Sequence, residues 1–369
     1  MSYGTSNGHP PRQKLGVAVL GATGTVGQRF IQLLADHPWF TVTEVAASER
    51  SAGKPYEEAC QWKLPGAIPA DVARLKVLPL EAAFTAPIIM SALPGEVAKY
   101  LEPALAAAGH LVSSNTSANR MGQDIPLLLP EINADHVRLI DAQRARGWAG
   151  GLVTMSNCTI VGVVMALAPL RRFGIERVNL VSMQAISGAG YPGVSSFDIL
   201  DNVIPYIGGE EDKAESEPKK ILGALAEGEI NAFAMDISAA CHRVPVMDGH
   251  TVAVSVGFRQ RPTEAEIRQA WETFSGHPLS AALPSHPAPV IAYVEESDRP
   301  QPRRDRDSGR GMTTTIGRLR PCSVLDYKFV TLSHNTIRGA AGGAILNAEL
   351  LVMQGYASHF ETATALEAN

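Results

Sequence analysis

Short apolar runs alternate with alanine-rich amphipathic segments along the first part of the chain. The runs are rich in Val, Ile, Leu and Ala, as buried parallel strands are. They cover residues 14–20, 41–47, 86–91 and 110–113. Segments 28–35 and 96–108 carry apolar positions at helical spacing. This alternation predicts a doubly wound, Rossmann-like parallel sheet with helical crossovers, an α/β fold.

The pattern changes near residue 155. A long apolar segment at 159–173 and an amphipathic one at 263–274 predict helices. Longer strands are expected at 178–184, 233–244, 251–258 and 289–294. A polar loop is expected at 300–311, and an alanine-rich helix at 337–354. The longer strands predict a second, α+β domain with a mixed sheet.

Composition agrees with two domains and narrows the class of protein. The chain has 369 residues, more than one ordinary core fills. A net charge of −5 gives no reason to expect nucleic acid, and Asp305 and Asp307 interrupt the basic cluster at 299–310, which favours a solvated loop. No apolar run reaches the roughly 18 residues of a membrane span, and the polar start at 1–13 has no signal-peptide core.

Cysteine usage points to a reducing compartment. The four cysteines have irregular spacing and no CxxC pair, so neither a disulfide framework nor a metal site is expected. Together with the missing membrane span and signal peptide, this predicts a cytoplasmic protein.

Three glycines, Gly21, Gly24 and Gly27, lie between the first strand and the first helix. Glycines there let the backbone approach a pyrophosphate, and the helix N-terminus adds free N–H groups and a partial positive charge. The spacing differs from the G-x-G-x-x-G form, so a tight turn without a ligand is the alternative. The position favours a dinucleotide site that also includes Thr23, Thr25 and Val26.

The end of the second strand bears on the choice of dinucleotide. Ser48, Arg50 and Ser51 offer donors suited to a 2′-phosphate, and a guanidinium forks onto phosphate oxygens. Glu49 leaves NAD open, because a carboxylate at this place can accept from the ribose hydroxyl. The pattern favours NADP.

Cys158 directly precedes the long apolar helix. A thiol at a helix N-terminus has a lowered pKa, so Cys158 is the candidate nucleophile, with a small buried hydrophobe as the alternative. His250 follows a turn at Asp248-Gly249 and is favoured over His242 as a proton-exchanging partner. Gln184 ends a predicted strand and is a candidate for orienting substrate or water.

Read together, the motifs resemble the aspartate-semialdehyde dehydrogenase family, in particular its archaeal and fungal branch. The resemblance runs from residue 15 to about 354. Its motifs lie at 21–27, 47–54 (ASERSAGK), 91–94 (SALP), 114–121 (SNTSANRM), 130–133 (PEIN), 156–159 (SNCT), 208–213 (GGEEDK), 243–250 (RVPVMDGH) and 334–342 (HNTIRGAAG). One departure is Cys158-Thr159-Ile160, where the family often has Cys-Ser-Thr.

The resemblance implies a role for each matching residue. Cys158 is similar to the nucleophile that forms a thioester, His250 to its acid/base partner and Gln184 to a positioning residue. Arg243 and Glu210 resemble the groups that meet the substrate carboxylate and ammonium. Arg120 and Lys213 resemble the pair of residues that holds the substrate phosphate, and Asn115 is expected near the same pocket. Cofactor contacts are implied for Ser91, Leu93 and Asn335 in addition to the residues named above.

The implied activity is the reversible, phosphate-dependent conversion of 4-phospho-L-aspartate to L-aspartate 4-semialdehyde with NADPH, toward lysine, threonine and methionine. A disordered leader (1–13), an NADP-binding domain (14–156, completed by a helix at about 338–356) and a catalytic and dimerisation domain (157–337) are expected, in a homodimer or homotetramer. Two alternatives remain open. One is a malonyl-CoA reductase-type CoA-thioester reductase, and the other is an NADP-binding redox sensor without turnover.

Overall fold

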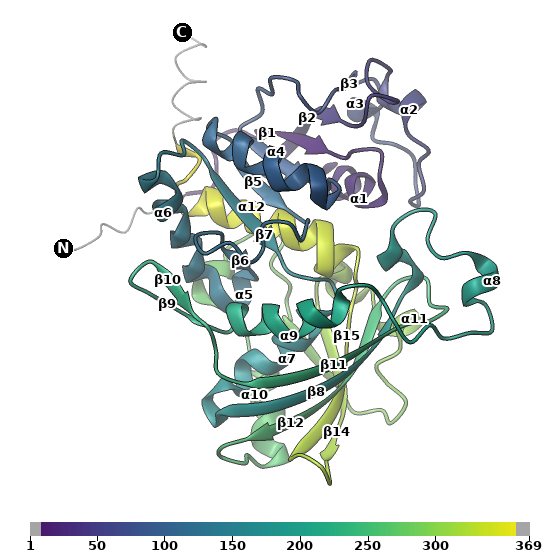
Figure 1. Cartoon of the computed structure of the whole chain (residues 1–369), viewed down its shortest axis with the longest axis vertical. Coiled ribbons are helices and arrows are strands. Elements are labelled where there is room, and N and C mark those ends of the chain that lie inside the picture. The colour runs from purple at the N-terminus through teal and green to yellow at the C-terminus, as the bar shows by residue number, and fades with distance from the viewer. Residues whose placement is uncertain (1–8, 359–369) are drawn as a thin grey trace.

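Residues 9–358 are described by a computed structural model in which two β-sheets lie one beyond the other along the long axis (Figure 1). The first eight residues of the expected leader lie outside the described residues. Among residues 9–358, no helix is both long and apolar enough to cross a membrane.

The first sheet is built from seven strands, all paired in parallel in the order β3-β2-β1-β4-β5-β7-β6. The strands are β1 (Leu15–Leu20), β2 (Phe40–Ala46), β3 (Val77–Leu78), β4 (Ile88–Ser91), β5 (Leu111–Ser114), β6 (Leu127–Leu128) and β7 (Gly151–Met155). Its helices are α1 (Thr25–Leu34), α2 (Tyr56–Ala59), α3 (Ala70–Ala73), α4 (Gly95–Ala107), α5 (Pro130–Asn133) and α6 (Leu139–Ala145).

Side chains of β1 point alternately to the two faces of this sheet. Val17 and Val19 belong to the core that includes α1, whereas Ala18 and Leu20 belong to a second core that includes α4. Both faces are therefore covered by helices, which explains why the strands read as continuous apolar runs. The predicted doubly wound α/β fold is confirmed.

The second sheet is mixed and has the order β11-β8-β12-β15-β14-β13. Its strands are β8 (Ile175–Gln184), β11 (Asp236–Arg243), β12 (His250–Phe258), β13 (Ile291–Val294), β14 (Thr314–Pro321) and β15 (Tyr327–Ser333), and β9 (Ala224–Ala226) pairs with β10 (Glu229–Asn231) as a separate hairpin. The accompanying helices are α7 (Ile160–Leu167), α8 (Ser196–Ile199), α9 (Glu210–Ile221), α10 (Glu264–Glu272) and α11 (Pro302–Asp305).

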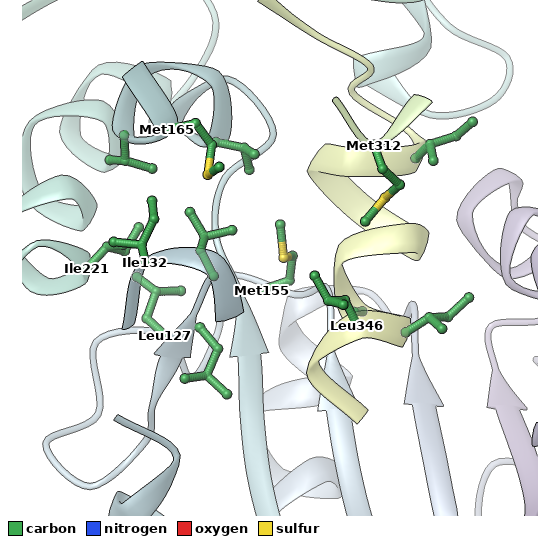
Figure 2. Packing of buried hydrophobic residues seen from close by; sticks show 14 of the residues in the cluster. Leu127, Ile132, Met155, Met165, Ile221, Met312 and Leu346 are labelled. Atoms are coloured by element: carbon green, nitrogen blue, oxygen red, sulfur yellow. The ribbon is translucent and has the colours of Figure 1, made fainter. Parts of the chain in front are cut away.

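Helix α12 (Gly342–Met353) returns to the first sheet after β15. Its Ala344 carbonyl accepts a hydrogen bond of 2.7 Å from Ser113 Oγ of β5. Figure 2 shows Leu346 of this helix near Met155, in a core that also reaches Met165 of α7. The last helix thus packs against the parallel sheet, and apolar side chains join the two halves of the molecule.

Several elements differ from the sequence expectation. Residues 300–311 are not a loop throughout, because Pro302 begins α11 and a 3₁₀ turn follows at Ser308–Gly311, but Arg303, Arg304, Asp307 and Arg310 are exposed as expected. Asp305 is buried, where it accepts the backbone N–H of Gln301 and pairs with Arg299. Helix α1 begins at Thr25 rather than at 28, and β7, β14, β15 and α9 were not predicted.

Candidate active site

Strand pairing brings three of the predicted residues together. Strands β8 and β11 are parallel, and Gln184 pairs in register with Arg243 at their carboxyl ends. The antiparallel neighbour β12 begins at this same edge with His250. His242 lies one position before Arg243 on β11, so its side chain points to the opposite face. The sheet therefore selects His250 over His242.

Cys158 lies between β7 and α7, at the end of the parallel sheet. Asn157 stabilises the turn that leads into the helix, because its Oδ1 accepts the Thr159 N–H at 2.8 Å and its carbonyl accepts the Ile160 N–H at 3.1 Å. Gly339 packs against the cysteine so closely that a Cβ there would lie 2.8 Å from Cys158 Cα. A glycine at 339 lets the turn before α12 support the backbone of the thiol.

The imidazole of His250 faces the sulfur, with 3.3 Å between Nε2 and Cys158 Sγ. Its other nitrogen, Nδ1, accepts the backbone N–H of Ala185 at 3.0 Å. The neutral ring therefore carries its proton on Nε2 and directs that proton at the sulfur. Burial, followed by the charges of Arg243 and His334, lowers the pKa of His250 to about 3.

The thiol itself differs from the sequence expectation of a lowered pKa. Burial, followed by the charge of Glu210, raises the pKa of Cys158 to about 12, although Arg120 and Arg243 act in the opposite direction. The prediction of a lowered pKa is wrong, because desolvation outweighs the effect of the helix terminus. With these pKa values, a neutral thiol lies beside a neutral imidazole at pH 7.

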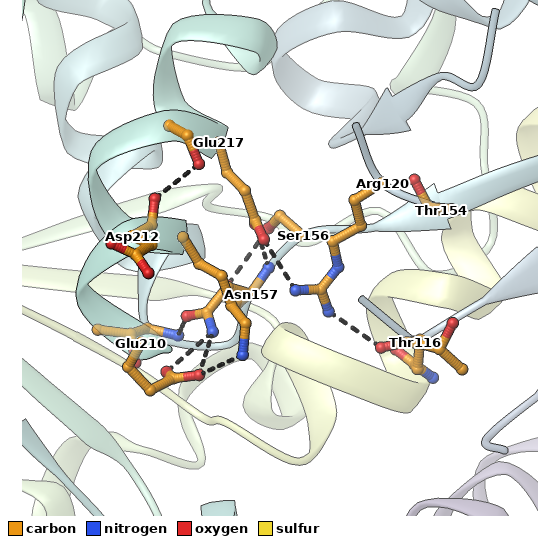
Figure 3. A network of polar contacts seen from close by, with 12 residues as sticks. Thr116, Arg120, Thr154, Ser156, Asn157, Glu210, Asp212 and Glu217 are labelled. Atoms are coloured by element: carbon orange, nitrogen blue, oxygen red, sulfur yellow. Dashed lines mark hydrogen bonds and ion pairs between the residues drawn. The ribbon is translucent and has the colours of Figure 1, made fainter. Parts of the chain in front are cut away.

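Glu210, at the start of α9, gathers the other polar groups around Cys158. It accepts hydrogen bonds from Asn157 Nδ2 (2.9 Å), Gln184 Nε2 (3.3 Å) and Lys213 Nζ (3.0 Å). Burial alone would raise the pKa of Glu210, but the bond from Asn157 and the charge of Lys213 outweigh it and lower that pKa. Figure 3 shows this carboxylate beneath Asn157.

Arg243 and Gly188 form the wall next to His250. The guanidinium donates from Nη1 to the Ala185 carbonyl at 2.7 Å and is buried. A Cβ at Gly188 would lie 2.7 Å from Arg243 Nη1 and 3.0 Å from His250 Cε1. Glycine at 188 is therefore what lets the guanidinium and the imidazole occupy neighbouring positions.

Arg120 reaches the same cluster from the segment after β5 (Figure 3). Its Nη1 pairs with Glu217 at 2.9 Å, and its Nη2 donates to the Asn115 carbonyl at 3.0 Å. Two buried donors, Arg120 Nε and Asn115 Nδ2, have no hydrogen-bond partner within residues 9–358. Unpaired buried donors are costly, so this pair fits an anionic ligand.

The glycine loop has the shape of a phosphate cradle. Gly21 has a φ of +72°, and a Cβ there would lie 2.5 Å from the Ala92 carbonyl oxygen. A Cβ at Gly27 would lie 2.2 Å from the Gly21 carbonyl oxygen. Helix α1 starts at Thr25 with Gly24 as its N-cap, so its free N–H groups border the loop.

The end of β2 lies beside this cradle, because the Ala22 N–H donates to the Ala46 carbonyl at 3.0 Å. Ser48 and Arg50 are exposed just beyond, and Ser51 is partly so. Backbone N–H groups, hydroxyls and an exposed guanidinium at these positions fit a dinucleotide.

Two implied cofactor contacts have side chains occupied elsewhere. Ser91 is fully buried, and its Oγ donates to Glu102 at 2.7 Å. The Asn335 amide accepts the Gly249 N–H at 2.8 Å and donates to Ser187 Oγ at 2.8 Å. Asn335 therefore holds together the two turns that flank His250 and Gly188, and sequence reasoning had not foreseen this contact.

Sequence reasoning missed four residues of this site: Asn157, Gly188, Glu217 and Gly339. Asn157 carried a usable signal, since Asn side chains commonly hydrogen-bond the backbone two residues on in a turn. Glu217 carried none, because it lies in the charged run of α9 and resembles a solvated side chain.

A parallel nucleotide-binding sheet, joined to a mixed-sheet domain with a cysteine and a histidine at the junction, defines a two-domain NAD(P)-dependent dehydrogenase. Residues 16–140 match the family described as semialdehyde dehydrogenase, NAD binding domain, and residues 167–338 match its dimerisation domain.

Proteins of known function are similar to this chain over more than nine tenths of its length. An aspartate-semialdehyde dehydrogenase of Archaeoglobus fulgidus is 49% identical over 340 residues, covering 92% of this chain and 98% of that protein. One of Trichophyton rubrum is 45% identical, covering 94% and 99%. The crystal structure of the Candida albicans enzyme with NADP has a TM-score of 0.85 at 40% identity, covering 93% of this chain and 100% of that one.

The chain belongs to the aspartate-semialdehyde dehydrogenase family and is an enzyme. This excludes the alternative of a redox sensor without turnover.

Proposed function

We propose that this enzyme interconverts L-aspartate 4-semialdehyde and 4-phospho-L-aspartate with NADP(H) and phosphate, through a thioester on Cys158. The observation that carries the proposal is the 3.3 Å approach of His250 Nε2 to Cys158 Sγ, beside Glu210 and Arg243. A nucleophile and a proton donor beside groups of both charges suit a small zwitterionic acyl substrate.

Each charged part of the substrate has a partner in this arrangement. Glu210 meets the ammonium, and Arg243 forks onto the α-carboxylate. Arg120, Lys213 and Asn115 hold the phosphate, supported by the unpaired donors at Arg120 Nε and Asn115 Nδ2. A solved aspartate-semialdehyde dehydrogenase of Vibrio cholerae, 27% identical with a TM-score of 0.73 over 92% of this chain and 98% of that one, was complexed with ASA.

The chemistry then follows from the side chains. In the reductive direction, Cys158 Sγ bonds to the acyl carbon, the bond from that carbon to the phosphate oxygen breaks, and phosphate leaves as hydrogen phosphate, which carries away the proton of the thiol. NADPH, when bound, supplies hydride to the thioester carbon, which gives a thiohemiacetal on Cys158. His250 Nε2–H donates a hydrogen bond to the oxygen that becomes negative. Breaking of the carbon–sulfur bond releases the aldehyde and a thiolate, which takes up a proton from water to restore the thiol.

NADP is the proposed cofactor, held by the cradle of Gly21, Gly24 and Gly27. Ser48, Arg50 and Ser51 would take the 2′-phosphate, and a C. albicans relative has been solved with NADP. Thr23, Thr25, Val26 and Leu93 would line the same site.

We infer a homodimer or homotetramer with the domain boundaries predicted from sequence. The match to a dimerisation domain supports this, as do exposed apolar side chains between β8 and α9, among them Phe197 of α8, which is 98% exposed. The cytoplasm as compartment stays a prediction.

The test is NADPH formation from aspartate semialdehyde and phosphate, followed by absorbance. Cys158→Ala should abolish turnover while NADP binding remains, and Cys322→Ala, which changes a cysteine far along the chain in the turn after β14, should turn over normally. Equal rates in wild type and Cys158→Ala would defeat the nucleophile assignment. Turnover that needs CoA and ignores phosphate would instead select the CoA-thioester reductase.

A further inference from the structure

Glu217 is a buried carboxylate that none of the proposed steps uses. It lies on α9, one to two turns after Glu210, and is only 2% exposed. Its Oε1 pairs with Arg120 Nη1 at 2.9 Å, and its Oε2 accepts the backbone N–H of Asn157 at 2.6 Å. One side chain therefore joins the arginine expected to hold phosphate to the residue directly before the thiol (Figure 3).

Lys220, one turn later on the same helix, strengthens this connection. Its Nζ donates to the carbonyl oxygens of Arg120, Gly122 and Ile125 at 2.7, 2.7 and 2.8 Å. Lys220 thus fixes the backbone of the segment that carries Arg120, while Glu217 fixes its guanidinium. Helix α9 holds both ends of the arginine.

The pairing requires two acceptor oxygens. A carboxylate accepts at both oxygens, and each oxygen of Glu217 faces one donor. A glutamine has one oxygen and one NH₂ group, so either Arg120 or the Asn157 N–H would face another donor. In this buried position, a donor left without an acceptor costs free energy. The lost hydrogen bond to the carboxylate is also roughly twice as strong as a bond between neutral groups.

We propose that Glu217 is a positioning residue of this reaction, which sets the guanidinium of Arg120 for the substrate phosphate and fixes the Asn157–Cys158 backbone relative to it. The inference rests on the proposed function for the identity of the anion. The geometry leaves Arg120 Nε free of partners within the described chain, which is what a preset anion-binding arginine needs.

The experiment compares Glu217→Gln with a matched control, Glu215→Gln. Glu215 lies on the same helix, but its carboxylate accepts the Ala239 N–H at 3.0 Å, on strand β11. We expect Glu217→Gln to raise the KM for phosphate about 10- to 100-fold and to lower kcat, with the KM for aspartate semialdehyde and the Kd for NADP within about twofold of wild type. Glu215→Gln should leave the KM for phosphate unchanged.

A second measurement does not depend on turnover. Phosphate bound at Arg120 should slow alkylation of Cys158 by iodoacetamide, measured by mass spectrometry in a Cys322→Ala background. Glu217→Gln should raise the phosphate concentration needed for half protection by the same factor as the KM. If the wild-type protein shows no turnover, but phosphate protects its Cys158 and fails to protect Cys158 in Glu217→Gln, the proposed function is refuted. The role of Glu217 in positioning Arg120 then still holds.

Glu217→Asp keeps the charge but is one methylene shorter, so it should give an intermediate KM for phosphate and guards against a Gln variant that fails to fold. The proposal is overturned if both variants have the wild-type KM and protection for phosphate. It is also overturned if the Tm falls and kcat, both KM values and the Kd for NADP all worsen together, since that result indicates a purely structural role.

Discussion

The orientation of His250 leads to a sharp prediction about its role. Its Nδ1 accepts the Ala185 N–H and its Nε2 faces Cys158 Sγ, so the ring acts as a donor. An imidazolium would place a second N–H against the Ala185 N–H. With a pKa of about 3, charging the ring at pH 7 costs roughly 5 kcal/mol, since one pKa unit is about 1.4 kcal/mol. The neutral His250 ring therefore serves as a hydrogen-bond donor and does not carry an extra proton at pH 7.

Two substitutions separate the two nitrogens. In His250→Gln, the amide nitrogen can reach the place of Nε2 and keep the donor. In His250→Asn, the amide oxygen can take the place of Nδ1 and keep the Ala185 bond, but no donor reaches the sulfur. A missing donor to a developing oxyanion costs about 10²- to 10³-fold in kcat. We expect that loss in His250→Asn and a loss of about tenfold or less in His250→Gln.

The assay is kcat for NADPH formation between pH 6 and 9, with the Tm as a check on folding. Wild type and His250→Gln should have pH profiles of the same shape, because a neutral ring does not titrate in this range. The reasoning would be refuted by two results together. Both variants would fold and lose kcat equally, and the wild-type pH profile of kcat would have an acidic limb that both variants lack, which would show that His250 must carry a proton.

Three further predictions concern Gly188, Arg50 and the pH dependence of the free energy of unfolding. Gly188→Ala should raise the KM for aspartate semialdehyde at least about tenfold with the Kd for NADP unchanged, because its Cβ would meet Arg243 Nη1 at 2.7 Å; unaltered substrate kinetics would contradict this. Arg50→Ala should weaken NADP far more than NAD in fluorescence titrations, and an unchanged affinity ratio would rule out a 2′-phosphate contact. Burial lowers the pKa of His250 from 6.5 to about 3, so the unfolded state binds the extra proton first and stability falls as the pH drops below 6.5. Urea unfolding should therefore show wild type losing about 2 kcal/mol more than His250→Gln between pH 7 and 5, and parallel losses would refute the lowered pKa.

The features that could be predicted from the sequence are those formed by residues close together in the chain. The loop at Gly21–Gly27 lies between a strand and a helix that are adjacent in the chain, and its φ and close contacts follow from that turn. The apolar strands of the first sheet were visible because both of its faces are buried. Most charges of the segment 300–311 are solvated, as expected, but the sequence did not reveal that Asp305 turns inward, where it accepts the backbone N–H of Gln301.

The site depended on pairing between distant segments. Gln184 and Arg243 meet because β8 and β11 are parallel neighbours, a register that neither strand encodes alone. The pKa of Cys158 could not be predicted for the same reason. Its position before α7 suggested a lowered value, but burial and the carboxylate of Glu210, more than fifty residues away in sequence, raise it.

A resting thiol with a raised pKa is compatible with a nucleophilic role, because the substrate changes the charges that raise it. Glu210 is the second cause of the high pKa of Cys158, and in the proposed function the substrate ammonium pairs with this carboxylate. Pairing offsets the negative charge that raises the pKa of Cys158, while Arg120 and the Nε2–H of His250 still favour the thiolate. Ionisation of the thiol is then coupled to the arrival of a substrate that carries an amino group. A substrate without that group would leave Glu210 charged, so the same contact that binds the ammonium also discriminates against acyl compounds that lack it.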